Sequence, residues 1–228
     1  MEIRRIDGNT QFKGYVDRSL VKFINSEMKA KCHTLAVEAA SYGKTVDPEK
    51  ILSVKKLGNE ILTKLSKFMN GLHEKTSLTY ERMSGGIRSD VYLENPICDR
   101  LIDVASTNKV TEYSLTMHSL PGENLEIFNN VAERLLKRNP MDINKDFLKY
   151  GESELKHIEE SYNGIFRMVV NKKAKALDKF AAAIGDEKTT HKADLDRRFE
   201  LSREIARKRN TLMSKSNALI NKIFRSES

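Results

Sequence analysis

A partial phosphate-binding motif occurs in the first quarter of the chain, at Gly43-Lys44-Thr45. In a complete phosphate loop these residues follow another glycine by five positions, because several backbone amides must converge on the phosphates. Glu38 holds that position here, and the surrounding pattern is helix-to-loop rather than strand-to-helix. We therefore expect no nucleotide-binding loop at this segment.

A partial metal-binding motif occurs further along, where Glu154 and His157 have the Glu-x-x-His spacing of a di-iron helix. Such a site needs a second Glu-x-x-His and two more glutamates on facing helices. The other four histidines are preceded at three residues by Ala, Asn, Leu or Lys, so no second copy exists. The sequence predicts no metal and no cofactor, and it predicts that His157 is a surface side chain.

Nucleophilic chemistry has no assembled motif either. Cys32 and His33 are adjacent, which turns their side chains about 100° apart on a helix and does not make a nucleophile–base pair. We therefore expect a protein that is not an enzyme. A catalytic site assembled from residues distant in the chain stays open as an alternative.

Cysteine content and apolar runs bear on the cellular compartment. Two cysteines, Cys32 and Cys98, are too few for a disulfide scaffold, so free thiols in a reducing compartment are expected. The first twenty residues carry seven charged side chains, which is unlike a secretory signal. No apolar run approaches the ~18 residues of a membrane span. These features predict a cytoplasmic protein with no transmembrane segment.

The net charge of +8 is concentrated at one end of the chain. Residues 167–225 contain 16 Lys/Arg and 7 Asp/Glu, whereas the remaining residues contain 24 and 25. The chain thus has a nearly neutral body and a basic C-terminal arm, which is typical of a segment that meets an anionic partner or is a solvated helix face.

The elements that must position these residues begin with two helices. Asp17 is a predicted N-cap, and Gly43 stands where a helix would end. Asp47-Pro48-Glu49 provides a cap, a proline at the first helical position and a first-turn acid, which predicts a second helix over residues 47–71. The two should form an antiparallel pair.

The middle of the chain predicts a small antiparallel sheet. Strands are expected at residues 77–83 and 87–93, around Ser84-Gly85-Gly86, and again at 110–118, with helices at 97–105 and 125–137. A further hairpin is predicted around Asp7-Gly8-Asn9. An aromatic and basic sheet face for single-stranded nucleic acid is an alternative use of these strands, through Tyr80, Tyr92, Tyr113, Arg82 and Arg88.

The C-terminal part predicts long helices. An apolar helical period runs over some forty residues from about Asn144, interrupted by Gly151 and Gly164, and a last helix follows over about residues 192–224. The two should form a coiled-coil-like antiparallel hairpin. Arg198 and Arg209 fall inside the apolar arc of the last helix, so they must either extend to its edge or pair with acids on the facing helix, such as the glutamates at 152, 154, 159 and 160.

Together these patterns predict a helix-dominated α+β fold, with a body at residues 1–140 and a basic helical hairpin at 141–228. The leading hypothesis is a non-enzymatic interaction or scaffold protein that uses its C-terminal helices for self-association or for binding a protein partner. A sequence-nonspecific nucleic-acid-binding protein acting through the same helices is the alternative. An anionic membrane surface is the least favoured partner, because the apolar arc is better used against the preceding helix.

Two sets of residues carry these hypotheses. The cations expected to meet a partner or nucleic acid are Lys172, Lys173, Lys175, Arg197, Arg203, Arg207, Lys208, Lys215 and Lys222. The apolar residues expected to form a helix–helix seam are Leu195, Phe199, Ile205, Leu212, Leu219 and Ile223.

Overall fold

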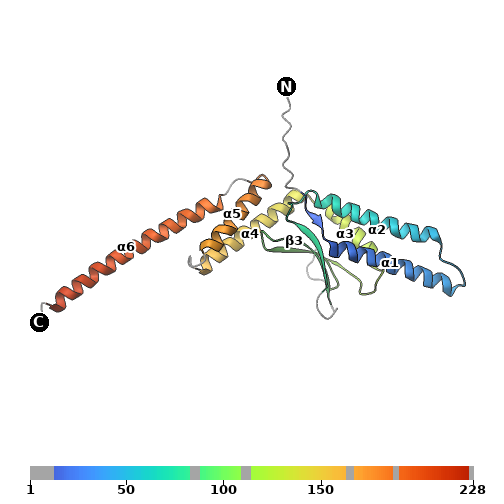
Figure 1. The fold of residues 1–228 in the computed structure, drawn as a ribbon, viewed down its shortest axis with the longest axis horizontal. Coiled ribbons are helices and arrows are strands. Elements are labelled where there is room, and N and C mark those ends of the chain that lie inside the picture. Colours follow the sequence, from blue (N-terminus) through green and yellow to red (C-terminus); the bar gives the residue numbers. More distant parts are fainter. Residues whose placement is uncertain (1–12, 83–87, 109–113, 163–166, 187–189, 226–228) are drawn as a thin grey trace, which may run out of the picture. The chain divides into compact units, whose positions relative to one another are not determined.

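The computed structural model describes residues 13–82, 88–108, 114–162, 167–186 and 190–225 (Figure 1). For the helical residues 161, 162, 215 and 217–225 it describes the backbone alone. Contacts divide the chain into two compact units, which we name the body unit (Met1–Glu154) and the tail unit (Leu155–Ser228). The fold is a helix-dominated α+β fold, with N-terminal helices, a five-stranded mixed sheet and four further helices.

The body unit starts with two long helices whose predicted ends are confirmed. The first helix, α1 (Arg18–Ser41), is capped by Asp17, whose carboxylate accepts from the amide of Ser19 at 2.7 Å. That hydrogen bonding, led by Ser19, lowers the pKa of Asp17. The second helix, α2 (Pro48–Met69), is capped in the same way by Asp47 and has Pro48 at its first position.

The end of α1 explains the Gly-Lys-Thr tripeptide. Gly43 has a φ of +65°, and its amide donates to Ala40 O at 2.9 Å. The amide of Lys44 donates to Ala39 O at 3.0 Å, which completes a helix-ending motif that favours glycine. Gly43 and Lys44 therefore end helix α1. Their backbone amides donate to carbonyl groups of that helix, whereas the amides of a phosphate loop converge on phosphates.

The sheet has the order β1-β2-β3-β4-β5, and its two edge strands correct the prediction of an antiparallel sheet. Strands β2 (Ser77–Arg82), β3 (Ser89–Asn95) and β4 (Arg100–Ser106) are antiparallel, which confirms the predicted hairpin of β2 and β3. The short strands β1 (Tyr15–Val16) and β5 (Leu115–Thr116) instead pair in parallel with β2 and β4. Because α1 and α2 connect β1 to β2, they form the long crossover that a parallel pair requires.

The predicted helix at residues 97–105 is wrong, because this segment is mostly strand β4. A tight turn joins β3 to β4, where the side chain of Asn95 accepts from the amide of Ile97 at 3.0 Å and Asp99 has a φ of 51°. The turn lets β4 pair antiparallel with β3 from Arg100 to Ser106, and the last two residues of β4 also pair with β5. Half-buried Ile102 and buried Val104 then favour a pleated strand.

Three further predictions fall partly or wholly outside the described residues. Of the strand predicted at 110–118, the structure describes β5 and the residues around it, and the hairpin predicted around Asp7-Gly8-Asn9 lies outside the description, as does Ser84-Gly85-Gly86. The helix predicted at 125–137 is confirmed as α3 (Leu125–Leu136).

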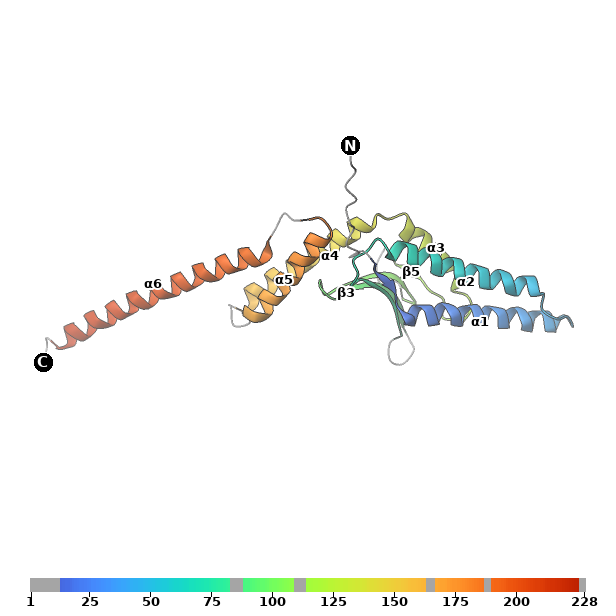
Figure 2. The ribbon, with the colours of Figure 1, turned by 45° about the horizontal axis from the view of Figure 1, so that its top comes forward.

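The core of the body unit lies between the sheet and its helices. Figure 2 shows α1 and α2 side by side, with α3 against α2. The ring of Phe23 on α1 stacks on Tyr80 of β2 with centroids 4.0 Å apart, and its edge meets Phe128 of α3 at 5.6 Å. The largest fully buried side chains of the body unit also include one residue that follows α2, Leu72, and several from α1, α2 and the sheet: Leu20, Ile24, Ile61, Leu65, Met69, Leu78 and Leu93.

The predicted forty-residue helix is two helices in the structure. The first, α4, spans Pro140–Tyr162, and the boundary between the two units falls inside it. The second, α5, spans Arg167–Ala183, and the last helix, α6, spans His191–Arg225. None of the helices in the described part of the chain is both long and apolar enough to cross a membrane.

Candidate interaction surface on the last helix

The first turn of α6 is fixed by a carboxylate from α5. Asp178 accepts the amide of His191 at 2.7 Å through one oxygen and the amide of Lys192 at 3.1 Å through the other. The Nδ1 atom of His191 lies 2.8 Å from the first of these oxygens. A side chain thirteen residues away thus takes the place of a local N-cap, and it ties the start of α6 to α5.

Alanine at position 178 should therefore loosen the first turn of α6. The amides of His191 and Lys192 would lose their acceptor, which should lower the free energy of opening this turn by about 1–2 kcal/mol. NMR chemical shifts of the Cα atoms in residues 191–195 should move towards random-coil values in Asp178→Ala. They should stay helical in Asp178→Asn, which keeps a side-chain oxygen, and unchanged shifts in both variants would contradict the assigned cap.

The next turns of α6 run antiparallel to α5 and pack on it. The guanidinium of Arg167, at the start of α5, lies 4.9 Å from the ring centre of Phe199 and 3.8 Å from Asp196. Leu195, one turn earlier in α6, is buried. Arg198 forms ion pairs with Glu159 of α4 at 3.1 Å and with Asp194 of α6 at 3.0 Å. Of the two predicted alternatives for this arginine, the structure shows the pairing with a glutamate of the preceding helical segment.

Beyond Phe199, α5 has no more residues to place beside α6. At 1.5 Å per residue, the 17 residues of α5 span about 26 Å and the 35 residues of α6 about 52 Å. Every described side chain from Glu200 to Ser214, and Ser216, is exposed. We name residues 200–225 the distal segment of α6.

The distal segment exposes a narrow apolar stripe. Leu201, Ile205 and Leu212 are 58%, 59% and 64% exposed, although each is a large aliphatic side chain. Their spacings of four and seven residues place them on one side of the helix, as in the seam of a coiled coil. Lys208 lies between Ile205 and Leu212 along this side of the helix. Exposed apolar side chains aligned in this way make this side a candidate interaction surface.

The predicted seam is thus realised in two different ways. Leu195 is buried and Phe199 is half-buried against α5, whereas Ile205 and Leu212 are exposed. Leu219 and Ile223 continue the same spacing on the helical backbone, with side chains outside the description. The sequence predicts one continuous seam, but the division of its partner helix into α4 and α5 leaves Ile205 and Leu212 exposed.

The predicted cations of α5 and α6 are mostly exposed where their side chains are described. Lys172 and Lys175 are exposed on α5, and Lys173 is half-buried there. Arg203 pairs with Glu200 at 2.9 Å and Lys208 with Glu204 at 2.8 Å, both within α6. Such exposed pairs along one helix add little stability. The other predicted cations of α6 are the exposed Arg197 and Arg207, and Lys215 and Lys222, which are described by backbone alone.

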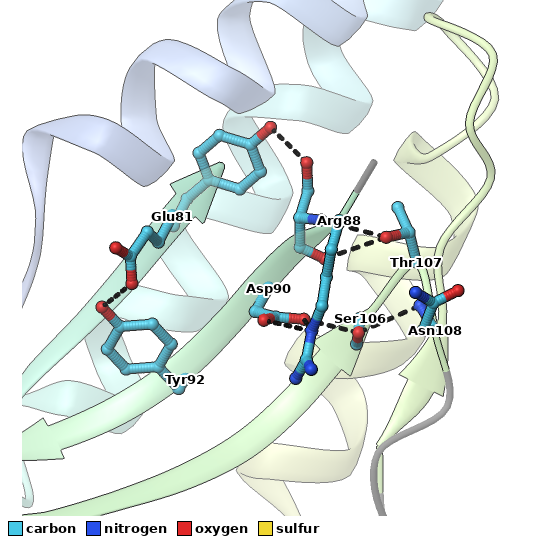
Figure 3. A network of polar contacts seen from close by, with 9 residues as sticks. Glu81, Arg88, Asp90, Tyr92, Ser106, Thr107 and Asn108 are labelled. Atoms are coloured by element: carbon cyan, nitrogen blue, oxygen red, sulfur yellow. Dashed lines mark hydrogen bonds and ion pairs between the residues drawn. The ribbon is translucent and has the colours of Figure 1, made fainter. Parts of the chain in front are cut away.

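In the body unit, a cluster of polar side chains lies at one end of β2, β3 and β4 (Figure 3). The buried carboxylate of Asp90 accepts from Ser106 Oγ at 2.5 Å and from Arg88 Nε, which lies 2.7 Å from its other oxygen. Thr107 and Ser89 join the same strands, with Thr107 Oγ1 accepting the amide of Ser89 at 2.9 Å. The partners of Asp90 lie on or beside the strands that it joins, so this cluster holds the strand register.

The tyrosines predicted to share one nucleic-acid face lie on opposite faces of the sheet. Tyr80 is opposite Val91 and stacks on Phe23, whereas Tyr92 is opposite Thr79 and donates to Glu81 at 2.9 Å. Burial, with help from Glu81, raises the pKa of Tyr92 to about 12. Side chains alternate along a strand, so these two rings cannot form one stacking platform, and Tyr113 lies outside the described residues.

Glu154 and His157, which form the partial metal motif, are not part of a larger group of metal-binding side chains among the described residues. His157 is exposed and Glu154 is half-buried on α4, and no cluster of three or more metal-binding side chains occurs among the described residues. Both cysteines, half-buried Cys32 and buried Cys98, are thiols rather than a disulfide.

Comparison of the chain with protein-family models, with curated proteins and with solved structures found no match.

Proposed function

We propose that this chain is a cytoplasmic, non-enzymatic interaction protein that docks the distal segment of α6 onto an acidic amphipathic helix of a partner protein. The observation that supports this proposal is the exposed stripe of Leu201, Ile205 and Leu212 on a helix that continues beyond its α5 partner. Burying such side chains against a partner would contribute roughly 1.5–3 kcal/mol each.

The width of the stripe favours a helix over a lipid surface. A helix that lies in a membrane interface buries a broad apolar face. Here Arg209 is exposed close to the stripe, and Lys208 follows Ile205 by three residues. A stripe one or two side chains wide matches the contact between two helices.

The position of the lysines favours an acidic partner over a second copy of this chain. Lys208, Lys215 and Lys222 each follow an apolar seam residue by three positions and recur every seven. In a heptad these are the second seam positions, so two parallel copies would bring the lysines face to face. Residues 205–225 contain six Lys/Arg and no Asp/Glu, and two copies would therefore repel along the whole segment.

A synthetic helix of complementary pattern tests the proposal. The probe has three heptads, with leucine at the first seam position and glutamate at the second, and a control peptide has glutamine in place of glutamate. The full chain should bind the glutamate peptide in calorimetry. The double variant Ile205→Asp/Leu212→Asp should bind it at least about tenfold more weakly, a loss of about 1.4 kcal/mol or more.

A substitution in the body unit is the control for this test, and either of two results would contradict the proposal. Leu52→Asp changes a side chain of similar exposure, 63%, in the body unit and should bind the peptide like the parent chain. Equal binding by the double variant would show that the stripe is not the docking surface. Tight binding of a random-sequence DNA duplex that the double variant retains, with a steep loss at high salt, would favour the nucleic-acid alternative.

A further inference from the structure

A cavity of about 580 Å³ lies in the body unit, independent of the docking segment. Its walls come from β4, from the residues after α3, and from the first half of α4, up to Ser153. Ile102 and Ile143 supply apolar surface within it. The volume is within the range of pockets that hold small organic ligands, about 300–1,000 Å³.

Three cations from three separate elements line this cavity. Arg100 is the first residue of β4, Arg138 follows α3, and Lys149 is in the middle of α4. The acid that lines it with them is Asp146. Cations that approach one space from distant parts of the chain repel one another, and an anion between them relieves that repulsion.

The position of Arg100 suits it to recognise an anion. Its guanidinium carbon lies 4.6 Å from the ring centre of Tyr150, which also lines the cavity. Stacking on an aromatic face fixes the plane of a guanidinium and leaves the N–H groups at its edge available to donate. A guanidinium held in this way presents paired donors to a phosphate oxygen pair.

We propose that this cavity binds the phosphate groups of a small phosphorylated molecule. Arg100, Arg138 and Lys149 hold the phosphate oxygens, and the hydroxyl of Ser153 supplies a further donor at the same cavity. The isoleucine surface and the Tyr150 ring accommodate the organic part of the ligand. Asp146 repels phosphate and accepts a hydrogen bond from a ligand hydroxyl, so it orients the ligand with its phosphates towards the three cations.

Calorimetry on the full chain tests this proposal with three probes: inorganic pyrophosphate, adenosine monophosphate and adenosine. Pyrophosphate or the monophosphate should bind, and adenosine should not. Lys149→Gln and Arg138→Gln should each weaken the binding about tenfold, because each removes a charge-assisted contact. Asp146→Asn should tighten pyrophosphate binding, because it removes a negative charge from the cavity.

Lys145→Gln is the matched control. Lys145 is an exposed cation one turn before Lys149 on the same helix and does not line the cavity, so its loss should leave binding nearly unchanged. All four variants alter exposed side chains, and unchanged circular dichroism would confirm that they fold. The proposal is overturned by no saturable binding of either phosphate probe, by equal binding of adenosine, or by an equal effect of Lys145→Gln.

Discussion

Replacing Phe128 with alanine should lower the free energy of unfolding of the body unit by about 3–5 kcal/mol, the range measured when a large aromatic side chain is removed from a core. Phe128 is fully buried in α3. Its ring meets the edge of Phe23 at 5.6 Å with an interplanar angle of 73°, and Phe23 in turn stacks on Tyr80. Removal of the ring leaves a cavity where α1, α3 and the sheet meet, and it also removes the aromatic pair.

Near-ultraviolet circular dichroism is the appropriate probe of this change. The chain has no tryptophan, so the tyrosines dominate that signal, and Tyr80 is part of the same aromatic cluster. Urea unfolding followed in this way should show a lower midpoint for Phe128→Ala and a smaller loss for Phe128→Leu. A loss below about 1 kcal/mol would contradict the packing of α3 against α1 described above.

Replacing Glu27 with alanine should lower the free energy of unfolding by about 2–4 kcal/mol, because it would leave two buried amides without an acceptor. Glu27 is on α1 and only 3% exposed. One oxygen of its carboxylate accepts the amide of Gly122 at 2.8 Å and that of Asn124 at 3.1 Å. Asn124 is the N-cap residue of α3 but makes no side-chain cap bond, so Glu27 supplies the capping acceptor from another helix.

The glutamine variant separates the charge of Glu27 from its hydrogen bonds. Glu27→Gln keeps one side-chain oxygen as an acceptor and should lose about 1 kcal/mol, the difference between a charged and a neutral acceptor. Gly122→Ala should disturb the same contact. The φ of Gly122 is +89°, and a Cβ there would lie 2.8 Å from the backbone nitrogen of Lys31. If Glu27→Ala unfolds at the same urea concentration as the parent chain, the assigned cap is wrong.

Local signals were enough to predict the ends of the first two helices. Asp17, Asp47 and Gly43 act on amides and carbonyls within a few residues, so their effect is visible in the sequence itself. The interaction of Glu27 with Gly122 joins residues 95 positions apart, and the Asp178 cap of α6 spans thirteen. No sequence pattern marks either contact, because both depend on how the helices pack.

The error at residues 97–105 had a direct effect on the candidate sites. The sequence predicts a helix for this segment, but the turn at Asp99 and the pairing with β3 produce a strand. A helix at this position does not predict that Arg100 lies beside Tyr150, although its guanidinium carbon is 4.6 Å from the centre of that ring. The cationic cavity could not be predicted, since its three cations are brought together by the sheet and two helices.

For the C-terminal helices, the sequence pattern predicted which residues are apolar but not which of them are exposed. Sequence periodicity predicted the apolar residues of α6 and left two alternatives for Arg198, of which the contact with Glu159 shows the pairing with an acid of the preceding helical segment. Exposure of Ile205 and Leu212 was not predicted, because the forty-residue pattern before α6 is divided between α4 and α5. The division shortens the facing helix by half and leaves the stripe open.

Hydrogen exchange of the full chain is the most direct test of the central claim that the described side chains of the distal segment of α6 are not covered by the other helices of the tail unit. In dilute solution, amides of residues 200–214 should exchange much faster than those of α5, because a helix without tertiary contacts opens readily. Adding the acidic peptide should slow their exchange and leave α5 unchanged. Equal protection of the two segments without peptide, at every protein concentration, would show that the stripe is already covered and would contradict the account.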